Sequence, residues 1–350
     1  MDNPHSMTHF LQPFGAKLPV IQASMAGIQG SALAMAVCHA GGLGSLPASM
    51  MTLETLEQEL QKLAAIHTPY NVNFFCHTAP TYNENIERAW RQILSPYYQK
   101  YGITPHIDPN STKQPGFTES IELLEHYNPP IVSFHFGLPK QDLVNRLKER
   151  GTTVIASATT VEEALYLEES GVDAVIAQGL EAGGHRGHFL SDDLSKQMGT
   201  LALLPQIVAT VSCPVIAAGG ISTPADISAA MNLGASAVQI GTAYLLCPET
   251  HTSALYRAAL KSTSARHTAI TNLFSGRPAR SIVNKLIKEL GAIRQDVPAF
   301  PLARQALADL RALAEQKGDT SFSAFWCGQN TQGCQEVSAT VLTQRLCQGL

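Results

Sequence analysis

Short apolar runs recur along the chain and alternate with longer amphipathic stretches. Eight of these runs have the length and the Gly, Pro or Ser borders that are typical of buried parallel strands. They span Val20–Ala23, Leu43–Leu46, Asn71–Phe75, Ile131–Phe134, Thr153–Ala156, Ala174–Gln178, Val215–Ala218 and Ala237–Ile240. The pattern therefore predicts eight parallel strands joined by helices.

The stretches between the strands carry the start and stop signals of helices. Thr52–Ile66, Thr160–Ser170 and Thr223–Leu233 each open on a threonine, and Lys140–Arg150 is followed by Gly151. Threonine caps the first turn of a helix, and glycine commonly ends the last one. Because strand and helix alternate until eight strands are used, we expect an α/β fold of the (β/α)8 TIM-barrel type. An open doubly wound sheet is the alternative that the pattern alone leaves open.

Two stretches interrupt this alternation, one after the third strand and one after the eighth. We expect residues 76–115 and 249–319 to form a mainly helical subdomain that acts as a lid or holds the substrate. Both stretches leave the C-terminal ends of strands, where barrel enzymes build their sites. The barrel would comprise residues 1–75, 116–248 and 320–350, and its tail, Phe322–Leu350, would return to close it.

Composition narrows the class of protein. Hydrophobic residues make up 45% of the chain and charged residues 15%, and the net charge is -4. About a quarter of residues is usually charged, so this chain fits a large buried core. No charge run indicates a nucleic-acid surface, and no apolar run reaches the roughly 18 residues of a membrane helix.

The cysteines and the N-terminus give expectations about the cellular setting. Seven cysteines without a CxxC pair favour neither a disulfide framework nor a zinc site, so no metal is expected. The first residues lack the basic and apolar segments of a signal peptide, and we expect a reducing, cytoplasmic setting. A homodimer is left open.

The strongest local motif is QGLEAGGHRG, at Gln178–Gly187, where the sixth strand ends. Its glycines let the backbone approach a flat ligand closely. His185 at the mouth of a barrel can serve as an acid, a base or a hydrogen-bond donor. An isolated histidine in a tight turn is more often solvated, but the glycines and the strand end favour a functional site.

Two more glycine pairs follow the last two strands, at Gly219-Gly220 and at Gly241-Thr242. In (β/α)8 barrels the loops after strands seven and eight commonly bind phosphate through backbone N–H groups. Tight turns also need glycine, but two such pairs at these positions predict a phosphorylated ligand.

Polar residues end several of the apolar strands. Asn73, Gln178 and Gln239 are carboxamides, and burying one without a partner costs about 1–3 kcal/mol. They should therefore meet a ligand, such as an isoalloxazine ring, or hydrogen-bond within the barrel. His135 faces either the site or the core. Gly42-Leu43-Gly44 opens a strand and lacks the third glycine of a dinucleotide motif, so we discount it.

At these residues the sequence resembles the nitronate monooxygenase family, formerly called 2-nitropropane dioxygenases. The glycine-rich histidine motif is shared with related flavin enoyl reductases. The leading Gln178, the HRGHF continuation and the SGRPAR segment favour the class that uses FMN and oxygen without NAD(P)H. The resemblance covers nearly the whole chain, at Pro19–Gly27, Ala36–Ala48, Asn71–Phe75, Ser133–Pro139, Gln178–Phe189, Pro214–Ile221, Val238–Leu245, Thr271–Arg280 and Phe325–Gln329.

The resemblance implies FMN as cofactor and O2 as co-substrate. The reaction would be the oxidative denitrification of alkyl nitronates, such as propionate 3-nitronate, to a carbonyl compound and nitrite. His185 would be the catalytic residue. Cofactor contacts would come from Met25, Asn73, Gln178, Gly183, Gly220, Gln239, Ile240, Gly241 and Thr242. The alternatives are an FMN-dependent NAD(P)H:quinone or enoyl reductase on the same fold, and a phosphate-binding barrel without flavin.

Three further positions bear on this expectation. The family usually has Pro where Ser24 stands, and Ser lacks the ring that fixes φ in the loop under the flavin. His185 would hydrogen-bond the nitronate, and a cationic form would favour the anion. Arg277 and Arg280 are candidates to attract the anion, although a structural role is favoured for both.

Overall fold

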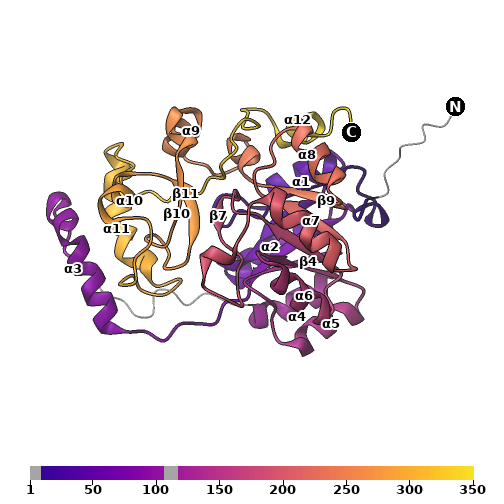
Figure 1. Ribbon diagram of the computed structural model, residues 1–350, viewed down its shortest axis with the longest axis horizontal. Helices are drawn as coiled ribbons and strands as arrows, with labels where there is room; N and C mark the ends of the chain where they lie inside the picture. Colours follow the sequence, from indigo (N-terminus) through magenta and orange to yellow (C-terminus); the bar gives the residue numbers. More distant parts are fainter. Residues whose placement is uncertain (1–8, 106–116) are drawn as a thin grey trace.

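The computed structural model describes residues 9–105 and 117–350, in which a barrel stands beside a smaller flanking unit (Figure 1). Residues 1–8 and 106–116 belong to the predicted barrel and insertion and lie outside the described residues. Within the described ranges, no helix combines the length and the apolar character that crossing a membrane requires.

Eight parallel strands form the barrel, in the order β1-β9-β8-β6-β5-β4-β3-β2. A parallel bridge between Ile21 and Leu43 joins the first strand in this order to the last. The sheet therefore closes, and the predicted (β/α)8 fold is confirmed. Each predicted strand corresponds to one of β1 (Val20–Gln22), β2 (Gly44–Pro47), β3 (Tyr70–Phe75), β4 (Ile131–His135), β5 (Thr153–Ala158), β6 (Ala174–Gln178), β8 (Val215–Ala218) and β9 (Ala237–Ile240).

Helices cover the outside of the barrel, and several begin at the predicted caps. The side chains of Thr52, Thr160 and Thr223 each accept a hydrogen bond from the backbone N–H three residues later. The last helix of the tail lies against the barrel, since Thr340 of α12 donates to the carbonyl of Ala36 at 2.8 Å, whereas Phe322 packs in the core of the flanking unit. The helices are α1 (Ser31–His39), α2 (Leu53–Ala64), α4 (Phe117–Tyr127), α5 (Gln141–Glu149), α6 (Val161–Glu169), α7 (Thr200–Thr210), α8 (Pro224–Asn232) and α12 (Ala339–Leu346).

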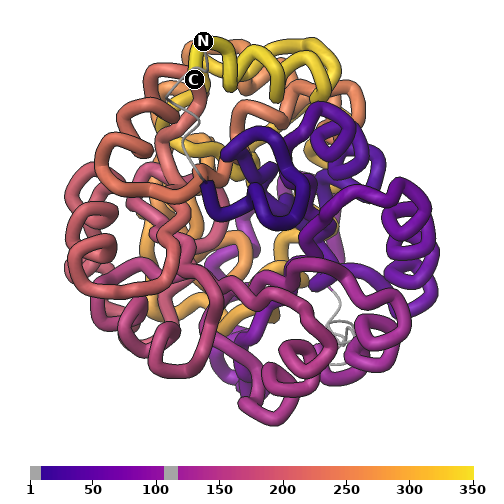
Figure 2. The backbone as a smooth tube through the Cα atoms, turned by 90° about the vertical axis from the view of Figure 1, so that its right-hand side faces the viewer, coloured from indigo at the N-terminus to yellow at the C-terminus, as the bar shows by residue number. Residues whose placement is uncertain are grey.

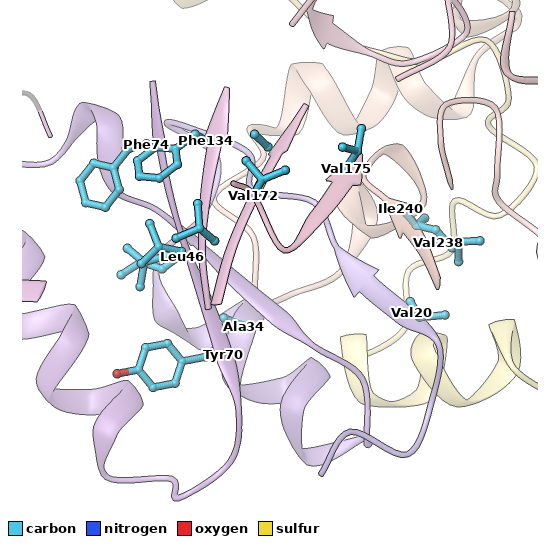
Figure 3. Packing of buried hydrophobic residues seen from close by; sticks show 14 of the residues in the cluster. Val20, Ala34, Leu46, Tyr70, Phe74, Phe134, Val172, Val175, Val238 and Ile240 are labelled. Atoms are coloured by element: carbon cyan, nitrogen blue, oxygen red, sulfur yellow. The ribbon is translucent and has the colours of Figure 1, made fainter. Parts of the chain in front are cut away.

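Alternating strand positions serve two different cores. Val132 and Phe134 of β4 pack with the helices in the outer core, where Val238 and Ile240 of β9 also lie (Figure 3). Ile131 belongs instead to the cluster inside the barrel. This follows from the two-residue period of a strand. The inward positions therefore can change from apolar to polar along a strand without disturbing the outer core.

The N-terminal end of the barrel is closed by the chain that precedes β1. Phe10, Leu11, Phe14 and Ala16 pack against the inward apolar residues of the strands. In Figure 2 this indigo segment, with the short 3-10 helix η1 (Gln12–Phe14), lies across the middle of the ring. The polar inward residues lie toward the opposite end of the strands, which faces the flanking unit.

The flanking unit has a hydrophobic core of its own, with Trp90, Leu273 and Leu310 fully buried in it. A mainly helical segment was expected here, but the structure also contains a three-stranded antiparallel sheet in the order β10-β11-β7. The elements are α3 (Glu84–Tyr101), α9 (Ala254–Lys261), α10 (Lys285–Leu290), α11 (Ala303–Gln316), β7 (Gly184–His185), β10 (Thr268–Thr271) and β11 (Ala279–Ile282). Short 3-10 turns complete the chain at η2 (Ala48–Met50), η3 (Leu194–Lys196), η4 (Thr242–Leu246) and η5 (Thr263–Arg266).

Candidate active site

A cavity of about 480 Å³ lies at the mouth of the barrel, between the strand ends and the flanking unit. This size is ordinary for a small-molecule site. Nine of the ten predicted site residues line it: Met25, Asn73, Gln178, Gly183, His185, Gly220, Gln239, Gly241 and Thr242. Ile240 does not, because its side chain is 1% exposed and packs in the outer core. Strand alternation turns it away from the face that Gln239 occupies.

His185 lies where the barrel meets the flanking unit. It belongs to β7, which pairs with β11 through the register His185–Ala279. Its ring lies 5.1 Å from that of Phe300 and 5.2 Å from that of Trp326, centroid to centroid. Burial, helped by nearby His135 and Arg277, lowers the pKa of His185 to about 3. The imidazole is therefore neutral near pH 7, not cationic as considered above.

Ser275 holds the imidazole of His185 from the flanking unit. Its Oγ lies 2.9 Å from Nε2 of His185 and 3.2 Å from the carbonyl oxygen of Arg277. The hydroxyl has one hydrogen, which it donates either to Nε2 or to the carbonyl. When it donates to Nε2, the imidazole carries its proton on Nδ1. Nδ1 makes no hydrogen bond to another described residue, so it is the ring atom left to meet a ligand.

Gln178 fixes the loop that carries His185. Its Oε1 accepts from the backbone N–H of Gly187 at 2.8 Å, and its Nε2 donates to the carbonyl of His185 at 3.0 Å. His135 donates to the same carbonyl through Nε2 at 3.2 Å, while its Nδ1 lies 3.1 Å from the Ser157 hydroxyl. Gln178 and His135 therefore position the backbone of His185, which is the internal bonding that the sequence left open for Gln178.

Arg186 is a fully buried cation that sequence analysis did not single out, although the HRG triplet contains it. Its guanidinium donates to the carbonyls of Gln178 and Gly179, both at 2.7 Å, and to Oε1 of Gln197 at 2.8 Å. Burial lowers its pKa to about 9. Arg186 thus fastens the end of β6 directly behind the histidine loop.

The ends of β8 and β9 present unused hydrogen-bonding groups to the cavity. The backbone N–H groups of Gly220, Gly241 and Thr242 donate to no other residue in the described part of the chain. Gly220 has a φ of 73°, which favours glycine. The carboxamide of Gln239 also lacks a partner within residues 9–105 and 117–350. These groups can receive an anion and a polar ring edge.

The loop that contains Ser24 is held by a buried pair of carboxamides. Oε1 of Gln29 accepts from the backbone N–H of Met25 at 3.2 Å and from Nε2 of Gln22 at 2.6 Å. Nε2 of Gln29 donates to the carbonyl of Ser45 at 2.7 Å. These bonds tie the backbone next to Ser24 to β2.

The relationship of the chain to known proteins agrees with this site. A sequence model described as nitronate monooxygenase matches residues 8–349. The chain belongs to the nitronate monooxygenase family. It is accordingly an enzyme and an oxidoreductase.

Relatives in this family align with nearly all of the chain. The nitronate monooxygenase of Paraburkholderia phytofirmans is 40% identical over 336 residues, covering 95% of this chain and 92% of its own. That of Pseudomonas aeruginosa is 40% identical over 346 residues, covering 97% and 98%. Among solved structures, the nitroalkane oxidase of Streptomyces ansochromogenes superposes with a TM-score of 0.87 at 37% identity, covering 96% of both chains. FabK of Thermotoga maritima superposes with a TM-score of 0.72 at 25% identity, covering 96% and 93%.

The two arginines considered above do not line the cavity of this nitronate monooxygenase family member. Arg277 donates to the carbonyl of His188 and lies 4.2 Å from the ring of Phe136. Arg280 donates to the carbonyl of Leu180 at 2.8 Å. Both are held by backbone and ring contacts, as the favoured structural role predicted.

Several residues that line the cavity come from the flanking unit and the tail and were missed by sequence analysis. They are His77, Ser275, Phe300, Arg304, Arg311, Trp326 and Asn330. For Arg304 and Arg311, a sequence signal was available, because a spacing of seven residues puts two side chains on the same face of a helix.

Proposed function

We propose that this family member is an FMN-dependent nitronate monooxygenase. It would oxidise alkyl nitronates such as propionate 3-nitronate with O2, giving a carbonyl compound and nitrite. The observation that carries the proposal is the position of His185, a neutral imidazole in an aromatic pocket that shares one cavity with unused backbone N–H groups at the ends of β8 and β9.

The residues around the cavity fit FMN. Free N–H groups at Gly220, Gly241 and Thr242 suit the phosphate, because backbone donors and a helix start bind anions without Lys or Arg. Gln239 offers its carboxamide to the polar edge of the isoalloxazine, and Asn73, whose Nδ2 donates to Oγ of Ser133 at 2.9 Å, offers its Oδ1. A side chain at Gly183 would place its Cβ 2.5 Å from the backbone N of Gly328. The cavity surface at Gly183 therefore has no side chain. We assign these residues, with Met25 and Gln178, to the cofactor site.

When bound, FMN would supply the redox chemistry, taking electrons from the carbanion-like nitronate and passing them to O2. His185 hydrogen-bonds the nitronate through Nδ1–H, while Ser275 donates to Nε2 and keeps the imidazole in that tautomer. Phe300 and Trp326 exclude water from the imidazole and strengthen this bond. The barrel thus serves as the cofactor half, and residues 76–115 and 249–319 as the substrate half.

The experiment is a visible spectrum of the purified protein under anaerobic conditions. We expect a flavin spectrum that bleaches when propionate 3-nitronate is added, and FMN in the supernatant after denaturation. NADPH should leave the spectrum unchanged. Bleaching by NADPH and not by the nitronate would replace the proposal with the reductase alternative, and a colourless protein that takes up no FMN would contradict the cofactor.

A further inference from the structure

Helix α11 presents two arginines to the cavity. Arg304 and Arg311 both line it, and they are seven residues apart on the same face of the helix, about 10 Å along its axis. Nη1 of Arg304 lies 3.9 Å from Sδ of Met50, on the barrel side of the cavity. In the part of the chain that the structure describes, neither arginine forms an ion pair.

No carboxylate in the cavity compensates these charges. Glu181 is the acidic residue among the described residues that line it. Its carboxylate already accepts from the backbone N–H of Thr200 at 2.8 Å and from the Thr200 hydroxyl at 2.9 Å, at the N-terminus of α7. Both arginines are exposed side chains at the cavity, and partial desolvation together with the charge of Arg311 lowers the pKa of Arg304. The cavity is therefore electropositive and attracts anions.

Arg304 follows closely in sequence on Phe300, which packs against the imidazole of His185. Phe300 packs against His185 at 5.1 Å between ring centroids, and Arg304 lies four residues later, in the first turn of α11. His185, Phe300 and Arg304 line the same cavity, so a molecule bound to His185 at one end can extend past Phe300 toward Arg304. The planar guanidinium can hold a carboxylate there through two hydrogen bonds.

We propose that Arg304 and Arg311 form an anion-binding subsite that selects nitronates with a carboxylate at the end of the chain opposite the nitronate. Arg304 binds the carboxylate, and Arg311, one step further out, draws the doubly charged substrate toward the cavity. This inference rests on the proposed function, because it assigns the far end of the same substrate.

The test compares two nitronates of equal chain length, propionate 3-nitronate and propyl-1-nitronate, which differ in the carboxylate. We expect the wild type to have the higher kcat/KM for propionate 3-nitronate. Arg304→Leu should reduce the ratio of the two kcat/KM values by about tenfold or more, since the charge-assisted hydrogen bonds to the carboxylate are lost, and the change should appear mainly in KM. Arg304→Lys should retain part of the preference.

Arg311→Leu should lower kcat/KM for propionate 3-nitronate less, and the loss should vanish at high salt because steering is screened. Arg150→Leu, which removes an exposed arginine on the barrel, is the matched control and should change neither substrate. Flavin content and the melting temperature verify that each variant is folded.

An unchanged ratio in the double variant Arg304→Leu/Arg311→Leu, with both substrates still turned over, would overturn the subsite alone. If that variant instead lost an NADPH-dependent flavin reduction seen in the wild type, the arginines would bind a nucleotide phosphate, and the inference would be wrong. Absence of turnover of both nitronates by the wild type would overturn the proposed function and the subsite with it.

Discussion

The barrel and the flanking unit reach the same cavity by different means. The barrel offers it backbone N–H groups and carboxamides at strand ends, such as Gln239 beside Gly241. The flanking unit and the tail offer rings and cations, namely Phe300, Trp326 and Arg304. Backbone groups depend on the fold, whereas side chains can be exchanged with the fold intact. We therefore expect the barrel to bind the cofactor and the flanking unit to select the substrate.

Two matched core truncations, one in each region, should have the largest effects and test this division of roles. Leu167 lies in the outer barrel core and Leu310 in the core of the flanking unit, and both are 0% exposed. Replacing either with alanine should cost about 2–5 kcal/mol of unfolding free energy. We expect Leu167→Ala to lower flavin content and turnover together, and Leu310→Ala to lower nitronate turnover while flavin content is retained.

The chain allows the two regions to be followed separately during urea unfolding. Its two tryptophans, Trp90 and Trp326, both pack in the core of the flanking unit, so their fluorescence reports that region. Flavin absorbance would report the barrel. In Leu310→Ala the fluorescence transition should move to lower urea than the flavin transition. Coincident transitions in this variant would mean that the two regions unfold as one unit, and the comparison would fail.

Substitutions at His185 test the place where the barrel meets the flanking unit. We expect His185→Asn to lower kcat about 100-fold with FMN still bound, because the hydrogen-bonding ring nitrogen is lost and the barrel contacts are retained. Ser275→Ala, which removes the partner of Nε2, should give a smaller loss. Stopped-flow reduction of the flavin by the nitronate measures both. Full turnover in His185→Asn would remove the histidine from the mechanism.

A smaller effect should appear in the dependence of stability on pH. Burial lowers the pKa values of His135 and His185 to about 3, from an ordinary value of 6.5. Between these values the unfolded chain binds protons that the folded chain does not, so stability decreases as the pH falls from 6.5 toward 3. Urea midpoints at pH 7 and pH 5 should show this decrease, and His135→Asn should make it shallower. Turnover should show no titration of His185 between pH 5 and pH 8.

Much of the barrel could be predicted from the sequence because each strand is a local signal. All eight apolar runs are strands, and α2, α6 and α8 begin at the threonine caps that the sequence predicted. The glycines after β8 and β9 pointed to the cavity for the same reason. Ile240 is the predicted site residue that does not line the cavity, as the alternation that puts Gln239 at the mouth already indicated.

The flanking unit was harder to predict because its structure depends on contacts between distant segments. Strand β11 pairs with the two residues of β7, about 95 positions earlier, and neither is long enough to give a periodic signal. Trp326 reaches His185 across a still longer separation in the chain. Such contacts become visible only when the barrel has brought the segments together.

The pairing of Gly184–His185 with Ala279–Arg280 has a practical consequence for protein engineering. The histidine is continuous in sequence with the barrel, yet its backbone is held by a sheet of the flanking unit. A chimaera that transplants the flanking unit of a relative must therefore bring a compatible edge strand, or the imidazole will lose its position even though no residue of the barrel has changed.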